Sequence, residues 1–248
     1  ALLGNYSTHY AGGPAVSADY FAVFAERVGA LIGAGQRAGP PFVGIMSNGT
    51  SGDANCYDFT QTTGRRFDRF SVADEVAKAA YAAYKSIRYY DWVPLAMAEE
   101  LLTLKVRMPT DKEAAVAGEF LETPEGKKLR SISAVYARET VLLKKMPATR
   151  ELRLQALRIG SLGITAIPNE VYGITGLKLK KDSPLKPTFN ISLANGCEGY
   201  IPPPDHHQLG GYTTWRARTS CLEEEAEPKI RKTLVGLLAK VPAARRDA

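Results

Sequence analysis

The spacing of apolar residues changes several times along this chain, and that change constrains the fold more than any other feature of the sequence. Residues 17–35 and 71–87 have apolar positions three and four apart, which is typical of helices. A short apolar run at 40–46 and alternating segments at 102–108 and 188–194 are typical of strands. Because strands and helices alternate in sequence, we expect an α/β fold with a layered mixed sheet flanked by helices.

The rest of the chain continues the same alternation. The sequence predicts further helices at 111–122, 127–145 and 222–241, two strands within 150–168 around Gly160 and Ser161, and a helix that opens after Asn169. Ser71 is expected to cap the helix at 71–87, with Asp74 as its capping-box partner. No late run of short strands indicates an appended β-sandwich, so we expect a single α/β domain over residues 1–248.

Composition excludes several classes of protein. The 248 residues are 45% hydrophobic and 23% charged, as in ordinary globular domains, and no apolar run approaches the length of a membrane span. The net charge is +6, but the basic residues are dispersed apart from 177–186 and the tail at 244–248, so no nucleic-acid interface is expected. The three cysteines contain no CxxC pair, which excludes a cysteine zinc cluster and favours buried thiols over one disulfide and one free thiol.

Two polar loops follow predicted strands, where ligands of α/β proteins usually bind. In "SNGTSGD" (47–53), Asn48 and Asp53 can orient a ligand or a water, although an ordinary turn uses the same residues. In "AIPNEVYGITG" (166–176), Glu170 lies where an apolar strand gives way to a helix. Glu170 is either a functional carboxylate or a residue favoured there by the helix dipole.

The histidines lie in two further loops. His9 is in "NYSTHYAGG" (5–13), as a surface residue or as one ligand of a metal site completed from far along the chain. His206 and His207 are in the long Pro-rich and aromatic loop at 193–215, and loops of this length are usually functional. Neighbours in an extended segment point in opposite directions, so at most one of the two is expected to reach a site.

Four blocks of this sequence, in collinear order, resemble the catalytic domain of the neutral/alkaline ceramidase family, and especially its bacterial ceramidase-like branch. The blocks are "NYSTHYAGG…VSADY", "MSNGTSGDANCYDF", "LGITAIPNEVYGITG" and "LANGCEGYIPPP…GGY". They resemble, respectively, the family's zinc-histidine block, its Gly-Asp active-site loop, its zinc-glutamate block and a block whose tyrosine binds or abuts the zinc. The four together are more specific than any one of them.

The resemblance implies a zinc-dependent amidohydrolase that cleaves an N-acyl bond with a zinc-activated water. The implied roles are zinc binding by His9, Glu170 and Tyr200, catalysis by Asp53, Asn55 and Tyr200, and substrate binding by Gly52, His206, His207 and Trp215. Imidazole and carboxylate are standard zinc donors. Tyr200 is an unusual one, and it can instead donate a hydrogen bond to the oxyanion. The resemblance also implies a secreted or periplasmic protein that acts on a small-molecule or lipid amide.

Two departures from the family pattern change these expectations. The family's first zinc histidine lies in an "HTHSGP"-like segment that this sequence does not contain. We therefore expect a catalytic domain without its N-terminal part, in a processed heteromer whose second chain, or missing N-terminal half, supplies another zinc histidine. The family's "GDVSPN" phrase reads "GDANCY" here, so Asn55 replaces an essential serine and a serine nucleophile at this position is excluded.

Two alternative functions remain open at this stage. A ceramidase-like subunit that has lost its metal would be a non-catalytic binder of lipid, glycan or protein. An esterase or lactam hydrolase would use the same zinc site on a different acyl group.

Overall fold

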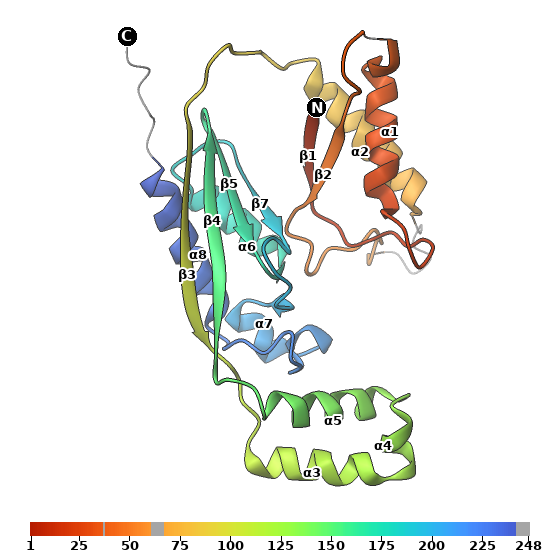
Figure 1. Ribbon diagram of the computed structural model, residues 1–248, viewed down its shortest axis with the longest axis vertical. Coiled ribbons are helices and arrows are strands. Elements are labelled where there is room, and N and C mark those ends of the chain that lie inside the picture. The colour runs from red at the N-terminus through yellow and green to blue at the C-terminus, as the bar shows by residue number, and fades with distance from the viewer. Residues whose placement is uncertain (37, 61–66, 242–248) are drawn as a thin grey trace.

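The computed structural model describes residues 1–36, 38–60 and 67–241, so the basic tail at 244–248 lies outside the described residues. Two bodies built on sheets lie side by side, and a helical hairpin extends beyond them at one end (Figure 1). Both sheets are flanked by helices, which confirms the predicted α/β class. Within the described residues, no helix is long and apolar enough to cross a membrane.

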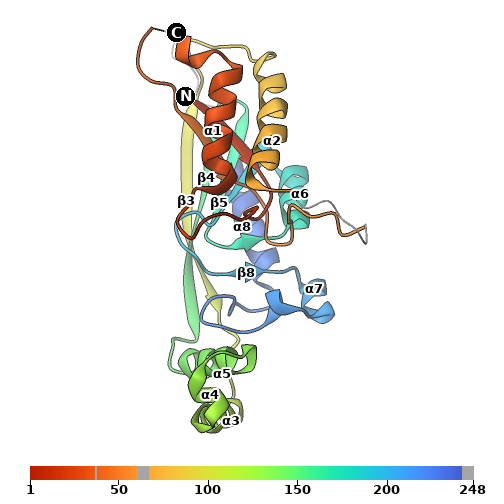
Figure 2. The ribbon, with the colours of Figure 1, turned by 90° about the vertical axis from the view of Figure 1, so that its right-hand side faces the viewer.

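The larger sheet has four strands in the order β3-β4-β5-β7. Their bounds are β3 (Leu95–Lys105), β4 (Thr149–Ile159), β5 (Leu162–Ile167) and β7 (Thr188–Ser192). β3, β4 and β5 pair antiparallel, and β5 and β7 pair parallel. Helices α6 (Gly173–Asp182) and α8 (Ala226–Lys240) lie on the same side of this sheet (Figure 2). Alternate strand residues such as Leu152 and Leu154 are buried in one core with Leu234 and Leu237 of α8.

The smaller sheet is a parallel pair of strands, β1 (Leu2–Tyr6) and β2 (Gly44–Asn48). Helices α1 (Asp19–Leu31) and α2 (Arg69–Tyr84) pack together beside it, and η1 (Ala34–Gln36) follows α1. A second core joins these elements, with Tyr20, Phe24 and Val28 of α1 fully buried. The two bodies meet where the Asn5 side chain donates a hydrogen bond to the carbonyl oxygen of Asn190 in β7, at 2.9 Å.

Short elements complete the described chain. The hairpin consists of α3 (Asp111–Glu122), α4 (Pro124–Lys128) and α5 (Ile132–Leu143), inserted between β3 and β4. A second short parallel pair is formed by β6 (Glu170–Val171) and β8 (Tyr200–Ile201). The polypeptide after β8 forms α7 (Pro204–Leu209) and η2 (Tyr212–Thr214).

The cap predicted for α2 is wrong. Asp68, not Ser71, is the N-cap residue, and its side chain accepts hydrogen bonds from the backbone N–H groups of Phe70 and Ser71. Ser71 is the third helical residue and closes the capping box by bonding back to the backbone N–H of Asp68. A carboxylate (Asp68) and a hydroxyl (Ser71) three residues apart are compatible with an N-cap at either residue. The residues before Ser71 have no apolar periodicity that would show which of the two assignments is correct.

Other boundaries differ for local reasons. The strand predicted at 40–46 begins only at Gly44, because Pro40 and Pro41 provide no backbone N–H for the ladder. The helix predicted at 127–145 is divided into α4 and α5, and Leu129 between them has a left-handed φ of 47°. His206 and His207 lie in the short helix α7, so the prediction that they are neighbours in an extended segment is wrong.

Candidate active site

Three side chains from distant parts of the chain meet at one place. His9 follows β1, Glu170 opens β6 and Tyr200 opens β8. Glu170 and Tyr200 are register partners in the parallel β6–β8 pair, which places them next to each other. His9 Nε2 lies 3.9 Å from Glu170 Oε2 and 3.4 Å from the Tyr200 hydroxyl. The structure therefore brings together the three residues that the sequence assigned to zinc.

The backbone around His9 is held by the neighbouring active-site loop. The backbone N–H of His9 donates to the carbonyl oxygen of Ala54 at 2.8 Å, and Thr8 is buried beside it. The Tyr20 hydroxyl donates to the carbonyl oxygen of Thr8 at 3.3 Å. Burial raises the pKa of Tyr20, so its hydroxyl keeps the proton that it donates.

Asp19 fixes the chain on the other side of His9. Its carboxylate accepts hydrogen bonds from the backbone N–H groups of Ala11 and Gly12, at 3.0 and 2.9 Å. The residue is buried and has a positive φ of 51°, an uncommon conformation that the surrounding hydrogen bonds maintain. Asp19 is therefore a positioning residue for the loop that presents His9, a role that sequence reasoning missed. The signal was present in the "SAD" phrase, since Ser17 accepts from the Asp19 backbone N–H.

We expect Asp19→Ala to weaken zinc binding by about 10- to 100-fold, the range found when a group that orients a metal ligand is removed. The variant would lack the carboxylate that accepts hydrogen bonds from the backbone N–H groups of Ala11 and Gly12. Titration of the apoprotein with zinc measures the effect, and Asp19→Asn, which keeps one acceptor oxygen, should recover part of the affinity. Unchanged zinc affinity in Asp19→Ala would show that the loop is held by other contacts.

A cavity of about 340 Å³ surrounds the three residues. It is lined by Thr8, His9, Tyr10, Asn48, Ser51, Asn55, Glu170, Leu193 and Tyr200. Asn48, the last residue of β2, donates to the hydroxyl of Ser51 in the loop that follows, at 2.9 Å. The side-chain oxygen of Asn48 is buried and has no hydrogen-bond partner among the described residues. Buried polar atoms are usually paired, so this oxygen is an exception in the wall of the cavity.

Gly52 and Asp53 attach the same loop to the Glu170 segment. The backbone N–H of Gly52 donates to the carbonyl oxygen of Val171 at 2.7 Å. A Cβ on Gly52 would lie 2.7 Å from the carbonyl oxygen of Glu170, so only glycine permits this approach. The Asp53 carboxylate accepts from the backbone N–H of Gly173 at 2.7 Å, at the start of α6. Asp53 thus caps a helix outside the cavity lining, and its catalytic role stays a prediction.

The environment of Tyr200 keeps its phenol protonated. Burial raises the pKa of Tyr200, and the neighbouring Tyr212 and the carboxylate of Glu170 raise it further. The rings of Tyr200 and Tyr212 are in edge-to-face contact, with centroids 5.6 Å apart. At neutral pH the hydroxyl can therefore donate a hydrogen bond to an oxygen atom that gains negative charge.

The three residues predicted at the substrate entrance lie outside the cavity lining. His206 contacts the ring of Tyr172 edge to face, and burial, with the positive charge of Arg107, lowers the pKa of His207. Trp215 packs edge to face on Tyr136 of α5, with centroids 5.2 Å apart. Their role in substrate binding stays a prediction.

The cysteines are all free thiols. Cys221 is buried, as expected for structural thiols, and burial raises its pKa. Cys56 is half-buried against the core of α1 and α2, and Cys197 is exposed. None of the three lines the cavity around His9.

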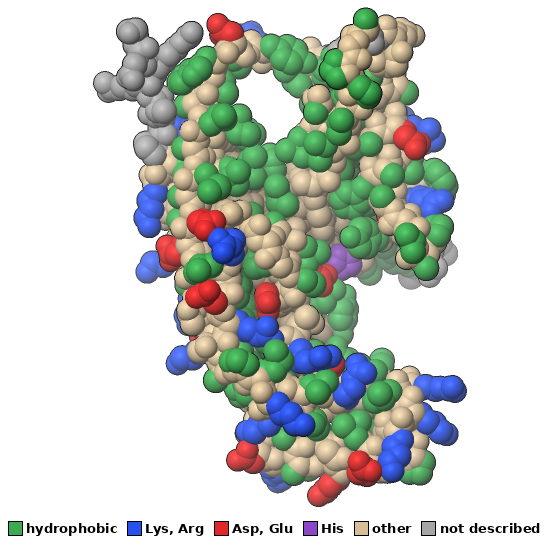
Figure 3. Space-filling model, in the orientation of Figure 1, with side chains coloured by type: hydrophobic (Ala, Val, Ile, Leu, Met, Phe, Trp, Pro, Cys, Tyr) green, Lys and Arg blue, Asp and Glu red, His purple; other side chains and the backbone are tan. Residues whose placement is uncertain are grey.

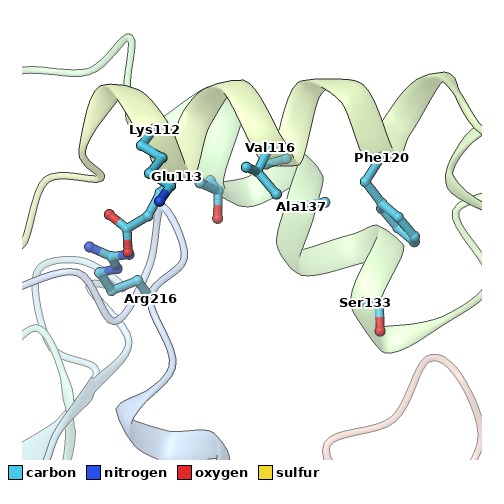
Figure 4. Close-up of a pocket in the computed structure, with 9 residues that line it drawn as sticks. Lys112, Glu113, Val116, Phe120, Ser133, Ala137 and Arg216 are labelled. Carbon is cyan, nitrogen blue, oxygen red and sulfur yellow. The ribbon is translucent and has the colours of Figure 1, made fainter.

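A larger hollow of about 480 Å³ lies elsewhere, between α3 and α5 of the hairpin (Figure 4). Its walls are mainly apolar, with Val116 and Phe120 on α3 and Ala137 on α5. The Arg216 and Glu113 side chains form an ion pair at one end of it. This hollow contains none of the predicted site residues and no cluster of catalytic groups, so the smaller cavity is the better candidate site.

The donors around His9 fit a zinc ion in chemistry and in spacing. Two ligands of one tetrahedral zinc, each at about 2.0–2.1 Å, lie roughly 3.3 Å apart. The measured separations of 3.4 Å and 3.9 Å are close to that value. Within the described residues, no three His, Cys, Asp or Glu side chains form a cluster that could hold a metal; the further oxygen beside His9 is the phenol of Tyr200.

Comparison with solved structures shows that this chain has the fold of the ceramidases. The neutral ceramidase from Pseudomonas aeruginosa is similar, with a TM-score of 0.62 and 12% identity over 99% of this chain and 45% of that chain. A ceramidase complexed with C2 has a TM-score of 0.63 and 11% identity, over 99% of this chain and 47% of that one. No protein-family model matches the sequence, and no curated protein does.

The resemblance read from four sequence blocks is therefore confirmed at the level of the fold. This chain spans somewhat less than half the length of the two ceramidases. That share is consistent with the expectation of a ceramidase-like fragment that lacks part of the protein.

Proposed function

We propose that this chain forms the active-site half of a ceramidase-like, zinc-dependent amidohydrolase that cleaves an N-acyl bond. One observation carries the proposal: His9, Glu170 and Tyr200, which come from three distant segments, converge on one cavity. An imidazole and a carboxylate at this spacing are a natural pair of zinc ligands. The similarity of the fold to ceramidases supports the same reaction class.

The metal would be held by His9 and Glu170, with the Tyr200 oxygen as a third donor. Bound zinc lowers the pKa of water to about 7 and polarises a carbonyl group. In the alternative role, Tyr200 is not a metal ligand, and its protonated phenol donates a hydrogen bond to the carbonyl oxygen of the substrate as that oxygen becomes negative.

Asn55 lines the same cavity and occupies the place of the family's serine. An amide side chain is not a nucleophile, so we assign Asn55 to orienting the substrate or the attacking water. A further histidine, from a second chain or from a missing N-terminal half, would raise the number of protein ligands to the level usual for catalytic zinc.

Metal analysis and substrate profiling of the purified native protein test the proposal. We expect about one zinc per particle, and release of fatty acid from short N-acyl amides faster than from the matched esters. Faster cleavage of esters or lactams would assign the same zinc site to the alternative hydrolase. Absence of zinc after purification without chelators, together with no hydrolysis, would instead support a non-catalytic binding subunit. That alternative is favoured by the small number of strong metal ligands among the described residues.

A further inference from the structure

One arginine near the hairpin has a different set of partners from its neighbours. Figure 3 shows Lys and Arg side chains gathered where the larger sheet meets the hairpin. Three arginines of this region are paired with carboxylates: Arg150 with Glu198, Arg216 with Glu113, and Arg218 with Glu139. The Arg107 side chain, between β3 and α3, instead donates to the backbone carbonyl oxygens of Thr214, Ser220 and Leu222, at 2.9, 2.8 and 2.8 Å. The planar guanidinium thus holds three points of one segment.

The first of these points to support Tyr200 is Ser220. Its hydroxyl oxygen accepts a hydrogen bond from the backbone N–H of Tyr200 at 2.9 Å. Its own backbone N–H donates to the carbonyl oxygen of Glu198 at 3.1 Å. Ser220 is buried and has a positive φ of 64°, an uncommon conformation that persists only where the surroundings hold it. Arg107 is one of the groups that hold Ser220 there.

The second point, Thr214, supports the ring of Tyr200. Thr214 is the last residue of η2, and Tyr212 at the start of η2 makes the edge-to-face contact with the Tyr200 ring. The middle residue, Thr213, is bonded through its hydroxyl to the phenol of Tyr172 at 2.6 Å. Arg107 therefore acts on both the backbone and the ring of Tyr200, although it lies 93 positions earlier in the sequence.

The third point is held in other ways as well. Leu222 forms a backbone bridge with Val106, and the backbone N–H of Arg107 donates to the carbonyl oxygen of Cys221 at 2.8 Å. These contacts do not use the side chain at position 107. A substitution there would keep residues 221 and 222 in place and release Thr214 and Ser220 from the guanidinium.

We propose that Arg107 is a positioning residue for Tyr200: its guanidinium fixes Thr214 and Ser220, and through them it places the phenol beside His9 and Glu170. The importance of that placement for zinc rests on the proposed function. The placement itself is a property of the metal-free chain and can be measured there.

Fluorine NMR of the metal-free protein, with 3-fluorotyrosine at position 200, tests the inference. We expect Arg107→Lys to shift or broaden the resonance, because a compact ammonium group lacks the planar fork that reaches all three carbonyls. Circular dichroism and the melting temperature show whether the variant is folded. Ser220→Ala removes only the acceptor of the Tyr200 backbone N–H and should change the resonance too, so it tests the same route if Arg107→Lys does not fold.

Arg158→Lys is the matched control. The Arg158 side chain also donates to backbone carbonyl oxygens, those of Gly160 and Val241, at 2.7 and 3.2 Å. It lies toward the opposite end of the β3–β4 pair from the strand ends that lead to Arg107. Its replacement should therefore leave the resonance of position 200 as it is in the parent.

Zinc titration completes the test with a double-mutant cycle. Arg107→Lys should weaken zinc binding about tenfold, as for other groups that orient a metal ligand, and should have no further effect in a Tyr200→Phe background. An unchanged resonance in folded Arg107→Lys or in Ser220→Ala would overturn the proposal, and so would an equal loss of zinc affinity with and without the Tyr200 hydroxyl. A changed resonance in a protein that binds no zinc would support the positioning role and reject the proposed enzyme, so the two failures are distinguishable.

Discussion

His9→Ala and Glu170→Ala are each expected to remove bound zinc and to reduce amide hydrolysis at least about 100-fold, with little change in unfolding temperature. Each variant removes one of the two strong ligands of the proposed metal site, and a zinc site cannot keep its affinity with the other alone. The stability should survive because both side chains lie at the cavity and are about a quarter exposed. Neither belongs to a hydrophobic core cluster of the described residues. Zinc content by atomic spectroscopy and initial rates on a short N-acyl amide measure the two effects.

Cys56→Ser is the matched control for these variants. Cys56 follows Asn55 directly but lies away from the cavity lining, so its substitution should leave zinc content and rate nearly unchanged. Loss of turnover in Cys56→Ser with zinc still bound would point to a thiol nucleophile in place of an activated water. Full retention of zinc in both His9→Ala and Glu170→Ala would contradict the assigned site.

The elements of this fold were predictable where the apolar spacing was long and regular. The alternation in 150–168 correctly divides into β4 and β5 at Gly160, because a single glycine with a φ of 62° makes the turn. β1 was missed, since its five residues include Gly4 and Asn5, which are depleted in strands. It forms because β2 pairs with every one of its residues.

The candidate site shows the same limit on sequence reasoning. On spacing alone, Glu170 is better explained as an ordinary helix-terminal carboxylate than as a functional residue. Only the four sequence blocks, taken in order, distinguished a functional carboxylate from a helix-terminal one. The resemblance could name His9, Glu170 and Tyr200 but could not show how they meet, because that depends on β6–β8 pairing between residues thirty positions apart. Asn48 as an unpaired acceptor, and Asp19 as an anchor of the His9 loop, depend on tertiary contacts that no local pattern records.

Gly199→Ala is expected to destabilise the protein by about 2–4 kcal/mol and to disrupt the site at the same time. Gly199 has a φ of 68°, which costs an L-residue roughly 1–2 kcal/mol. A Cβ there would also lie 2.3 Å from the backbone nitrogen of Ser220, a clash that side-chain rotation cannot relieve. The carbonyl oxygen of Gly199 accepts from the backbone N–H of Glu170 at 2.9 Å, so the strain would be transmitted to the pairing of Glu170 with Tyr200.

The test is to measure denaturant unfolding of Gly199→Ala and of Gly236→Ala. The comparison distinguishes an effect specific to position 199 from the general effect of replacing glycine by alanine. Gly236 lies inside α8, and a Cβ there meets nothing within 4 Å. Alanine in a helix interior is favoured over glycine by about 1 kcal/mol, so this control should be slightly more stable than the parent. A fall in midpoint for Gly199→Ala with zinc affinity unchanged would mean that β6 and β8 stay paired despite the strain. A midpoint equal to that of the parent would mean that the segment from Gly199 to Ser220 relaxes freely, and Tyr200 would then lack the rigid support that its role beside His9 requires.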